Sequence, residues 1–184
     1  MNSDSTRRLG RVALCCRFKP VHLGQVVMLE SILERADHLI IGIGSTNKYD
    51  VRNPFTVEET RAMLGLALGG VPGSHEFLDV PDLDDGPRWR LMMLDLLGDD
   101  LDLFVTANDY VRSLLEGDYP IRHPAGIVPR ERWVRVNGTI VRTAMARGEP
   151  WRHMVPDAVA DYLEREGLVD RFRSEFGLET IAQG

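Results

Sequence analysis

The chain has 184 residues, of which 43% are hydrophobic and 27% charged, values typical of a globular protein with a substantial core. Its formal net charge of −6 argues against a general nucleic-acid binder, although a few arginines can still form a local positive pocket. No apolar run reaches membrane-spanning length, and the only cysteines, Cys15 and Cys16, are adjacent and would strain the backbone if paired. We therefore expect a cytoplasmic protein that contacts neither membranes nor nucleic acid, with reduced cysteines in its core.

Short apolar, β-branched runs alternate with segments of helical periodicity along the chain. Strands are predicted at residues 12–16, 39–43, 75–80, 101–106 and 133–136, with an extended edge over 121–128. Helices are predicted at residues 23–36, 57–68, 87–97, 109–115, 139–148, 156–165 and 168–176. This alternation predicts an α/β fold with a doubly wound parallel sheet and a helical C-terminal part. Residues 1–184 are expected to form one domain, and residues 1–8 a loose N-terminus.

The turn between the first predicted strand and the first predicted helix carries the strongest functional signal. Such a turn presents backbone N–H groups and the positive end of a helix dipole to an anion. Here it also holds Arg17, whose guanidinium matches phosphate oxygens, His22, which can donate a hydrogen bond, and Gly24, which permits close approach. A histidine that only caps the helix is the alternative, but the strand–turn–helix context favours a phosphate site.

A second anion site is possible near residue 139. Thr139 is predicted to be the N-cap of a helix, so free N–H groups point towards this end, and Arg142 lies one turn later on the same side. From these residues alone, a capped surface helix without a ligand remains the simpler interpretation. A capping box is also predicted between Thr56 and Glu59.

Residues 16–25 resemble the GRFxPxHxGH motif of the nucleotidyltransferase superfamily, with Cys16 and Gln25 replacing its leading glycine and second histidine. Over roughly residues 10 to 165, further segments match the archaeal-type nicotinamide-nucleotide adenylyltransferases in the expected order. These segments are residues 41–45 (IGIGS), 52–56 (RNPFT), Asp82 with Trp89, Asn108, 138–142 (GTIVR), 150–151 (PW) and 155–156 (VP).

The resemblance implies a Rossmann-like nucleotidyltransferase fold and an enzyme that transfers AMP from ATP, with Mg²⁺, to nicotinamide mononucleotide or nicotinic acid mononucleotide. The products are then NAD or deamido-NAD and pyrophosphate, and a homo-oligomer is expected. The residues implied in ATP binding are Arg17, Phe18, His22, Gly24, Arg52, Thr139 and Arg142. The residues implied in acceptor binding are Gly42, Ser45, Asp82, Trp89 and Asn108. No residue is assigned as a metal ligand, because the histidines outside the motif lack metal-ligand spacing.

Catalysis is assigned to Arg17, His22, Gln25 and Arg142, which would neutralise charge as the acceptor phosphate attacks the α-phosphorus of ATP. Glutamine donates only as a neutral amide, whereas a histidine cation makes a hydrogen bond roughly twice as strong. Loss of a preorganised donor typically costs on the order of 10²–10³ in rate. Gln25 is therefore expected to slow catalysis without abolishing binding, unless it is an engineered substitution or marks a changed reaction.

Three hypotheses remain open at this point. The first is the adenylyltransferase that the resemblance implies. The second is a related nucleotidyltransferase with another phosphate- or phosphonate-bearing acceptor, which is favoured by Gln25 and by Gly86 at the place of a family asparagine. The third is a catalytically weak homologue that binds nucleotides without turnover.

Overall fold

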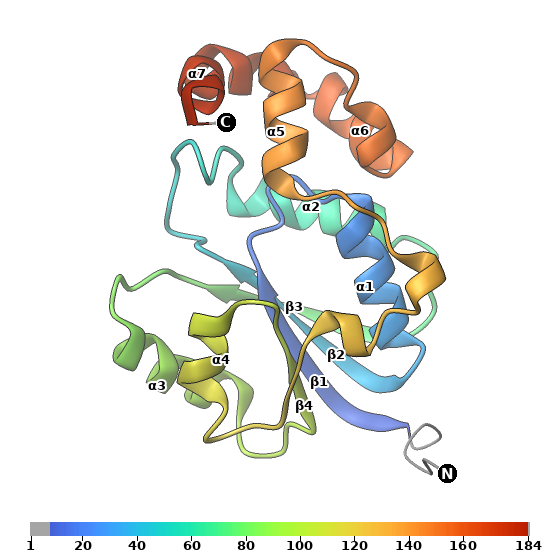
Figure 1. The fold of residues 1–184 in the computed structure, drawn as a ribbon, viewed down its shortest axis with the longest axis vertical. Helices are drawn as coiled ribbons and strands as arrows, with labels where there is room; N and C mark the ends of the chain where they lie inside the picture. The colour runs from blue at the N-terminus through green and yellow to red at the C-terminus, as the bar shows by residue number, and fades with distance from the viewer. Residues whose placement is uncertain (1–7, 184) are drawn as a thin grey trace.

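A five-stranded parallel sheet forms the centre of the computed structural model, which describes residues 8–183 (Figure 1). Its strands, in the order β3-β2-β1-β4-β5, are Leu9–Cys16 (β1), Ala36–Gly44 (β2), Ser74–Val80 (β3), Leu103–Val105 (β4) and Ile121–Arg122 (β5). The chain winds outwards from β1 to β3 and then returns to β4 on the other side of β1. At the centre, Leu14 pairs with Ile41 of β2 and with Val105 of β4. The prediction of a Rossmann-like, doubly wound sheet is confirmed.

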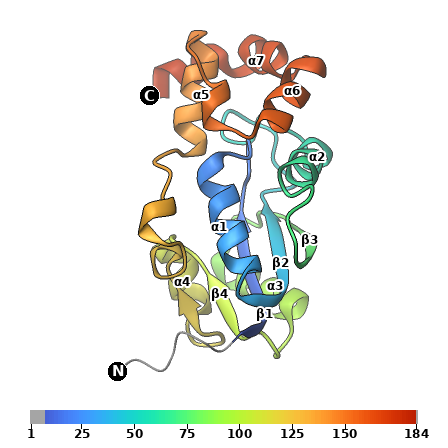
Figure 2. The ribbon, with the colours of Figure 1, turned by 90° about the vertical axis from the view of Figure 1, so that its right-hand side faces the viewer.

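Helices cover both faces of the sheet and one of its ends (Figures 1 and 2). The helices are α1 (Leu23–Leu33), α2 (Val57–Ala67), α3 (Gly86–Leu97), α4 (Asp109–Leu115), α5 (Gly138–Arg147), α6 (Asp157–Arg165) and α7 (Leu168–Gln183). Helices α5 to α7 gather beyond the carboxyl ends of the strands, at the top of Figure 1, which confirms the predicted helical C-terminal part. Within residues 8–183, no helix is long and apolar enough to cross a membrane.

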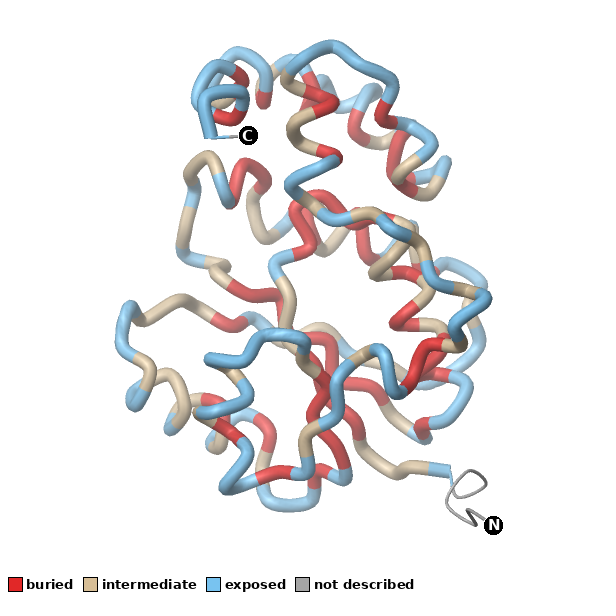
Figure 3. Tube along the Cα trace, viewed as in Figure 1, coloured by how far each residue is buried: buried red, intermediate tan, exposed pale blue. Residues whose placement is uncertain are grey.

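Alternation of side chains along β1 assigns its residues to two cores, as expected for a strand buried on both faces. Leu14 packs in the cluster that includes residues of α1, α2 and α5 to α7, whereas Ala13 belongs to the cluster with Met93 of α3 and Leu115 of α4. The buried residues follow the central strands and the inner sides of these helices (Figure 3). Both faces of the sheet are therefore covered at its central strands, whereas the edge strand β3 is only partly buried.

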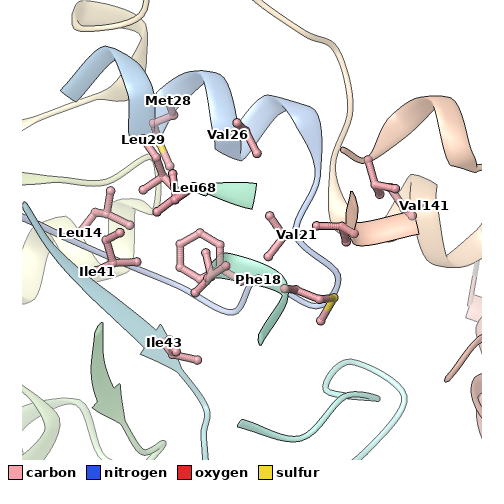
Figure 4. Close-up of a cluster of buried hydrophobic side chains, with 14 of the residues drawn as sticks. Leu14, Phe18, Val21, Val26, Met28, Leu29, Ile41, Ile43, Leu68 and Val141 are labelled. Carbon is pink, nitrogen blue, oxygen red and sulfur yellow. The ribbon is translucent and has the colours of Figure 1, made fainter. Parts of the chain in front are cut away.

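The turn after β1 is anchored from below by this core. Phe18 and Val21 of the turn are 1% and 0% exposed, and they lie in the same cluster as Leu29 of α1 and Val141 of α5 (Figure 4). Phe18 has a φ of 57°, which is rare for a bulky residue and occurs mainly where the surroundings impose it. The packing thus fixes the path of the turn and joins it to α5.

The predicted strand at residues 133–136 is wrong, since this segment has no regular structure. It runs across the start of α1, where the carbonyl oxygens of Val134 and Val136 face Gly24. Just before it, Arg132 forms ion pairs with Glu30 of α1 and with Glu34, the C-cap of that helix. Contact with a helix replaces pairing with a strand. The predicted edge over 121–128 also shrinks to the two residues of β5, followed by a 3₁₀ turn.

Three helix ends differ from the prediction. The cap of α5 is Asn137 and not Thr139: the Asn137 side chain accepts a hydrogen bond from the backbone N–H of Ile140 at 2.9 Å. Helix α7 runs to Gln183 rather than to residue 176, because Gly177 is buried inside it and tertiary packing outweighs the helix cost of glycine. Helix α1 ends at Leu33, because β2 begins at Ala36, earlier than predicted.

Of the predicted loose N-terminus, residues 1–7 lie outside the described residues. Arg8 is held by Asp37 and donates to the carbonyl oxygen of Ala36 at 2.7 Å. That residues 1–184 form one domain stays a prediction.

Candidate active site

A cavity of about 880 Å³ opens at the carboxyl ends of β1, β2 and β4. It therefore lies at the crevice where the winding of the chain reverses, the usual ligand site of open α/β sheets. Its wall includes Arg17 after β1, Ser45 after β2 and Asn108 after β4. These three side chains come from different parts of the sequence, and the parallel sheet brings them to one edge.

The cavity has two chemically different ends. The cationic end, near α5, is formed by Arg17, Phe18, Lys19, Gln25, Asn137, Gly138, Thr139 and Arg142. The acidic end, near α3 and α4, is formed by Asp82, Asp84, Asp85, Gly86, Trp89, Asn108 and Tyr110. Helix α5 lies at the top of Figure 1 and helices α3 and α4 at its lower left. An elongated ligand with an anionic part and a less anionic part fits this division.

His22 is the N-cap of α1 and is paired with Gln25 in a capping box. Its ring Nδ1 accepts from the backbone N–H of Gln25, and Gln25 Oε1 accepts from the backbone N–H of His22, both at 3.3 Å. Because Nδ1 is an acceptor, the ring proton lies on Nε2. Burial, aided by the charge of Arg142, lowers the pKa of His22 to about 4. At neutral pH, His22 is thus a neutral donor with a fixed tautomer.

Gln25 combines a structural role with a free donor. Its Oε1 is used in the capping box, but its Nε2 amide has no partner within residues 8–183, and the residue lines the cavity. Glutamine therefore reproduces the position of a hydrogen-bond donor without the option of positive charge.

Arg142, at the cationic end, lies within the electrostatic influence of two further guanidinium groups, those of Arg17 and Arg52. Arg142 donates to the carbonyl oxygen of Lys19 at 2.8 Å and lies 3.5 Å from Thr139 Oγ1, which confirms that these two predicted residues share one side of α5. Burial, followed by the charge of Arg17, lowers the pKa of Arg142 to about 10, and Arg52 contributes in the same direction. Positive charges clustered in this way form a candidate anion-binding site.

Arg52 does not reach the main cavity. It lines a second cavity of about 290 Å³ that shares Arg17, Thr139 and Arg142 with the first, so it lies on the far side of the cationic end.

At the acidic end, the backbone is shaped by side-chain caps. Asn108 is the N-cap of α4, and its Oδ1 accepts from the N–H groups of Tyr110 and Val111 at 2.9 and 3.2 Å, which leaves its amide as a donor. Asp85 caps α3, since its Oδ1 accepts a hydrogen bond from the backbone N–H of Arg88 at 2.9 Å. Trp89 lies on the cavity wall, where an aromatic face can stack on a flat ring.

Residues 13–144 match the family model described as cytidylyltransferase-like. Nicotinamide-nucleotide adenylyltransferase of Thermococcus onnurineus is 31% identical over 161 residues, covering 85% of this chain and 83% of the relative. That of Thermoplasma acidophilum is 32% identical over 171 residues, covering 91% and 93%. The chain belongs to this adenylyltransferase family.

A solved structure agrees on the fold. A bifunctional NMN adenylyltransferase/ADP ribose pyrophosphatase from Francisella tularensis, complexed with AMP and a Mn ion, aligns with a TM-score of 0.67 at 16% identity. The alignment covers 95% of this chain and 52% of that protein, so the chain spans about half its length. At this identity the likeness supports the nucleotidyltransferase fold.

The family motifs predict that Gly24 and Gly42 contact ligands. In the structure, both glycines instead allow two segments of the backbone to approach each other closely. A Cβ on Gly24 would lie 3.1 Å from the carbonyl oxygen of Val136, and one on Gly42 would lie 3.0 Å from that of Leu14. Gly42 sits inside the sheet between β1 and β3, and Gly44, not Gly42, lines the cavity. The other predicted acceptor residues, Ser45, Asp82, Trp89 and Asn108, do line it.

Lys19 is a cavity residue that the sequence analysis missed. It is 3% exposed, and its Nζ donates to the carbonyl oxygen of Ser45 at 3.2 Å. Burial, followed by opposing contributions from Asp50 and Arg17, lowers the pKa of Lys19 to about 8. The available signal was a lysine at a variable position inside the family motif. Lys19 gives the cavity a cation whose charge is adjustable near physiological pH.

Tyr110 is the second residue that was missed. Its hydroxyl occupies the space that a Cβ at position 86 would take, and its ring carbon Cζ would lie 3.0 Å from that Cβ. Gly86 and Tyr110 are therefore a matched pair, in which the absence of one side chain admits the other. The family asparagine at this place does not fit beside Tyr110 in its observed position.

The two cysteines are free, as expected, but they are half-buried at the cavity wall rather than in the core. Burial raises the pKa of both thiols, that of Cys16 to about 11, so they stay protonated at neutral pH. They are not candidates for a nucleophile.

Proposed function

We propose that this protein transfers AMP from ATP to nicotinamide mononucleotide or nicotinic acid mononucleotide, forming NAD or deamido-NAD and releasing pyrophosphate. The observation that carries the proposal is that Arg17, Gln25 and Arg142 line one end of a cavity whose other end presents Trp89 and Asn108. His22 is not part of the cavity wall itself, but it is hydrogen-bonded to Gln25, and the charge of Arg142 helps to lower its pKa. Family membership supports the reaction type, and the geometry supports the task that is proposed for each residue.

The chemistry needs no covalent enzyme intermediate. An oxygen of the acceptor 5′-phosphate attacks the α-phosphorus of ATP in line, the bond from that phosphorus to the bridging β-phosphate oxygen breaks, and pyrophosphate leaves with the electron pair. The chain contributes position and charge neutralisation. Arg17, Arg52 and Arg142 are proposed to hold the triphosphate, together with Thr139. His22 Nε2 and Gln25 Nε2 are proposed to donate to oxygens that gain charge.

ATP is proposed to enter as its Mg²⁺ complex, with the cation held mainly by phosphate oxygens and water, as this ion prefers. The cationic end of the cavity fits that arrangement, because its guanidinium and amide groups bind oxygens of the phosphate rather than the metal. At the acidic end, Trp89 is proposed to stack on the pyridine ring and Asp82 to contact the ribose or the ring substituent.

One observation at the acidic end favours a second candidate function with a different acceptor. Tyr110 fills the space beside Gly86, so the acidic end differs in shape from the family pattern. A nucleotidyltransferase that uses another phosphate- or phosphonate-bearing acceptor is therefore the second candidate. A homologue that binds without turnover, as Gln25 suggests, is the third.

The test is pyrophosphate release with ATP and Mg²⁺, with each mononucleotide offered in turn and the product identified by mass. NAD or deamido-NAD in the reaction with wild-type protein supports the proposal. Silence with both acceptors, while calorimetry still detects ATP binding, overturns it and directs the search to other acceptors.

A cytoplasmic location and a homo-oligomeric state are proposed with the function. The free adjacent cysteines support a reducing compartment. The homo-oligomer rests on the family resemblance, and sedimentation velocity of the purified chain tests it.

A further inference from the structure

The second cavity joins segments from the whole length of the chain. Its volume is about 290 Å³, and its wall is formed by Arg17, Val51, Arg52, Thr139, Arg142, Thr180 and Gln183. The three arginines come from the turn after β1, from the loop after β2 and from α5. The last two residues belong to α7, to which neither the motifs nor the proposed mechanism gives a task.

Thr180 presents a buried hydroxyl without a partner. The residue is 7% exposed, and its Oγ1 makes no hydrogen bond within residues 8–183. A buried hydroxyl in this state is costly and calls for an explanation. Thr60 shows the usual solution on a helix: it is 0% exposed, and its hydroxyl donates back to the carbonyl oxygen of Thr56 at 2.8 Å.

The position of α7 is set by contacts that do not involve Thr180. Arg171 forms a two-pronged ion pair with Glu59 of α2, with one N–O distance of 2.7 Å, and also donates to the carbonyl oxygen of Pro54. Arg173 donates to the carbonyl oxygen of Met145 at 2.7 Å. The helix is therefore fixed against α2 and α5. These contacts place Thr180 at the cavity wall without any hydrogen bond of its own.

The cavity continues the cationic end of the main cavity, since Arg17, Thr139 and Arg142 line both. A triphosphate whose α-phosphate lies in the main cavity would extend its outer phosphates into this space. Building on the proposed function, we propose that Thr180 donates its hydroxyl to an outer phosphate oxygen of ATP, so that α7 is part of the site that holds the leaving pyrophosphate. The partner missing in the free protein is then a ligand oxygen.

The test uses inorganic pyrophosphate as the probe and compares Thr180→Val, which keeps the shape and removes the hydroxyl, with Thr180→Ser, which keeps the hydroxyl. We expect Thr180→Val to weaken pyrophosphate binding in calorimetry about tenfold, as loss of a hydrogen bond to a charged group does. We expect it to raise the KM for ATP while leaving the KM for the mononucleotide unchanged, and Thr180→Ser to stay near wild type.

A thermal unfolding measurement separates binding from folding. Because Thr180→Val removes a buried group that has no partner, the free variant should melt at the same temperature as the wild type or higher, but pyrophosphate should raise its Tm less. The matched control is Thr60→Val, which should lower the Tm and leave pyrophosphate binding unchanged. A role of Thr180 in folding alone predicts the reverse: a lower Tm and unchanged affinity.

Equal pyrophosphate affinity of the wild type and Thr180→Val overturns the inference, whether or not the wild type makes NAD. If the wild type makes neither NAD nor deamido-NAD, the proposed function fails. In that case the pyrophosphate titrations still decide whether Thr180 contacts a phosphate ligand.

Discussion

The two ends of the cavity are built in opposite ways. At the cationic end, the loop after β1 and the first turn of α1 stabilise each other. Phe18 is buried in the core, and His22 and Gln25 exchange two hydrogen bonds. At the acidic end, Tyr110 is 61% exposed and meets Gly86 from a separate helix. The first end is preorganised by local geometry, as charge stabilisation requires. The second is adjustable, so it is the place where substrate choice can change while the chemistry is kept.

The largest effect is expected for His22→Asn. This variant tests whether His22 contributes to catalysis as a hydrogen-bond donor or only stabilises the cationic end as the N-cap of α1. Asparagine is among the best N-cap residues, so the free energy of unfolding should change little. The Nε2 donor is lost, and kcat should fall on the order of 10²–10³. Steady-state kinetics beside thermal unfolding check this. A lower Tm together with an unchanged kcat of the folded protein would show that His22 acts as a cap alone.

The next largest effect is expected for Gln25→His, which adds the option of a cationic donor at the same end. In its neutral form, a histidine can still accept at Nδ1 from the N–H of His22, and on protonation it gives up this hydrogen bond and becomes a cationic donor. Because a charge-assisted hydrogen bond is roughly twice as strong as a neutral one, kcat should rise about tenfold, with the KM for the mononucleotide unchanged. Gln25→Ala serves as the control that lacks any donor. No rise in kcat would indicate that the cationic end has been rebuilt for another reaction.

Lys19 should make the cationic end sensitive to alkaline pH. Its pKa is about 8 in the folded protein, so its charge is lost above that pH and kcat/KM for ATP should decline several-fold towards pH 9. Lys19→Met should show a lower kcat/KM at pH 7 and no decline with this midpoint. A pH–rate profile of both proteins measures the difference, and a shared decline would assign it to another group.

The same lysine should change stability with a definite sign. The folded-state pKa lies below the unfolded value of 10.5, so the unfolded chain binds more protons between pH 8 and 10.5, and wild-type stability gains a contribution as pH rises through this window. Below pH 8 the burial of the charged amine is a constant cost. Lys19→Met should therefore be the more stable protein at pH 7, and its advantage should shrink towards pH 10 in denaturant titrations.

The sequence predicted the features that depend on local contacts and missed those that depend on contacts between distant segments. The turn between β1 and α1 and the capping box of Thr56 and Glu59 were predicted correctly, because each depends on residues within a few positions of one another. Lys19 was missed, since its importance arises only when the sheet places it beside Ser45. Tyr110 and Thr180 were missed for the same reason. Periodicity and motif spacing report local geometry, and contacts between distant helices leave no such signal.

The smallest effect is expected at the acidic end, from Gly86→Ala. The new Cβ would collide with the hydroxyl of Tyr110, but that side chain is exposed and can swing outwards, so the Tm should fall by only a few degrees. The displaced ring should change the KM for the mononucleotide a few-fold and leave the KM for ATP unchanged. Gly117→Ala is the matched control, since a Cβ there meets no atom within 4 Å. A change in the KM for ATP instead would show that the two ends of the cavity are coupled, and that the acidic end is not free to vary on its own.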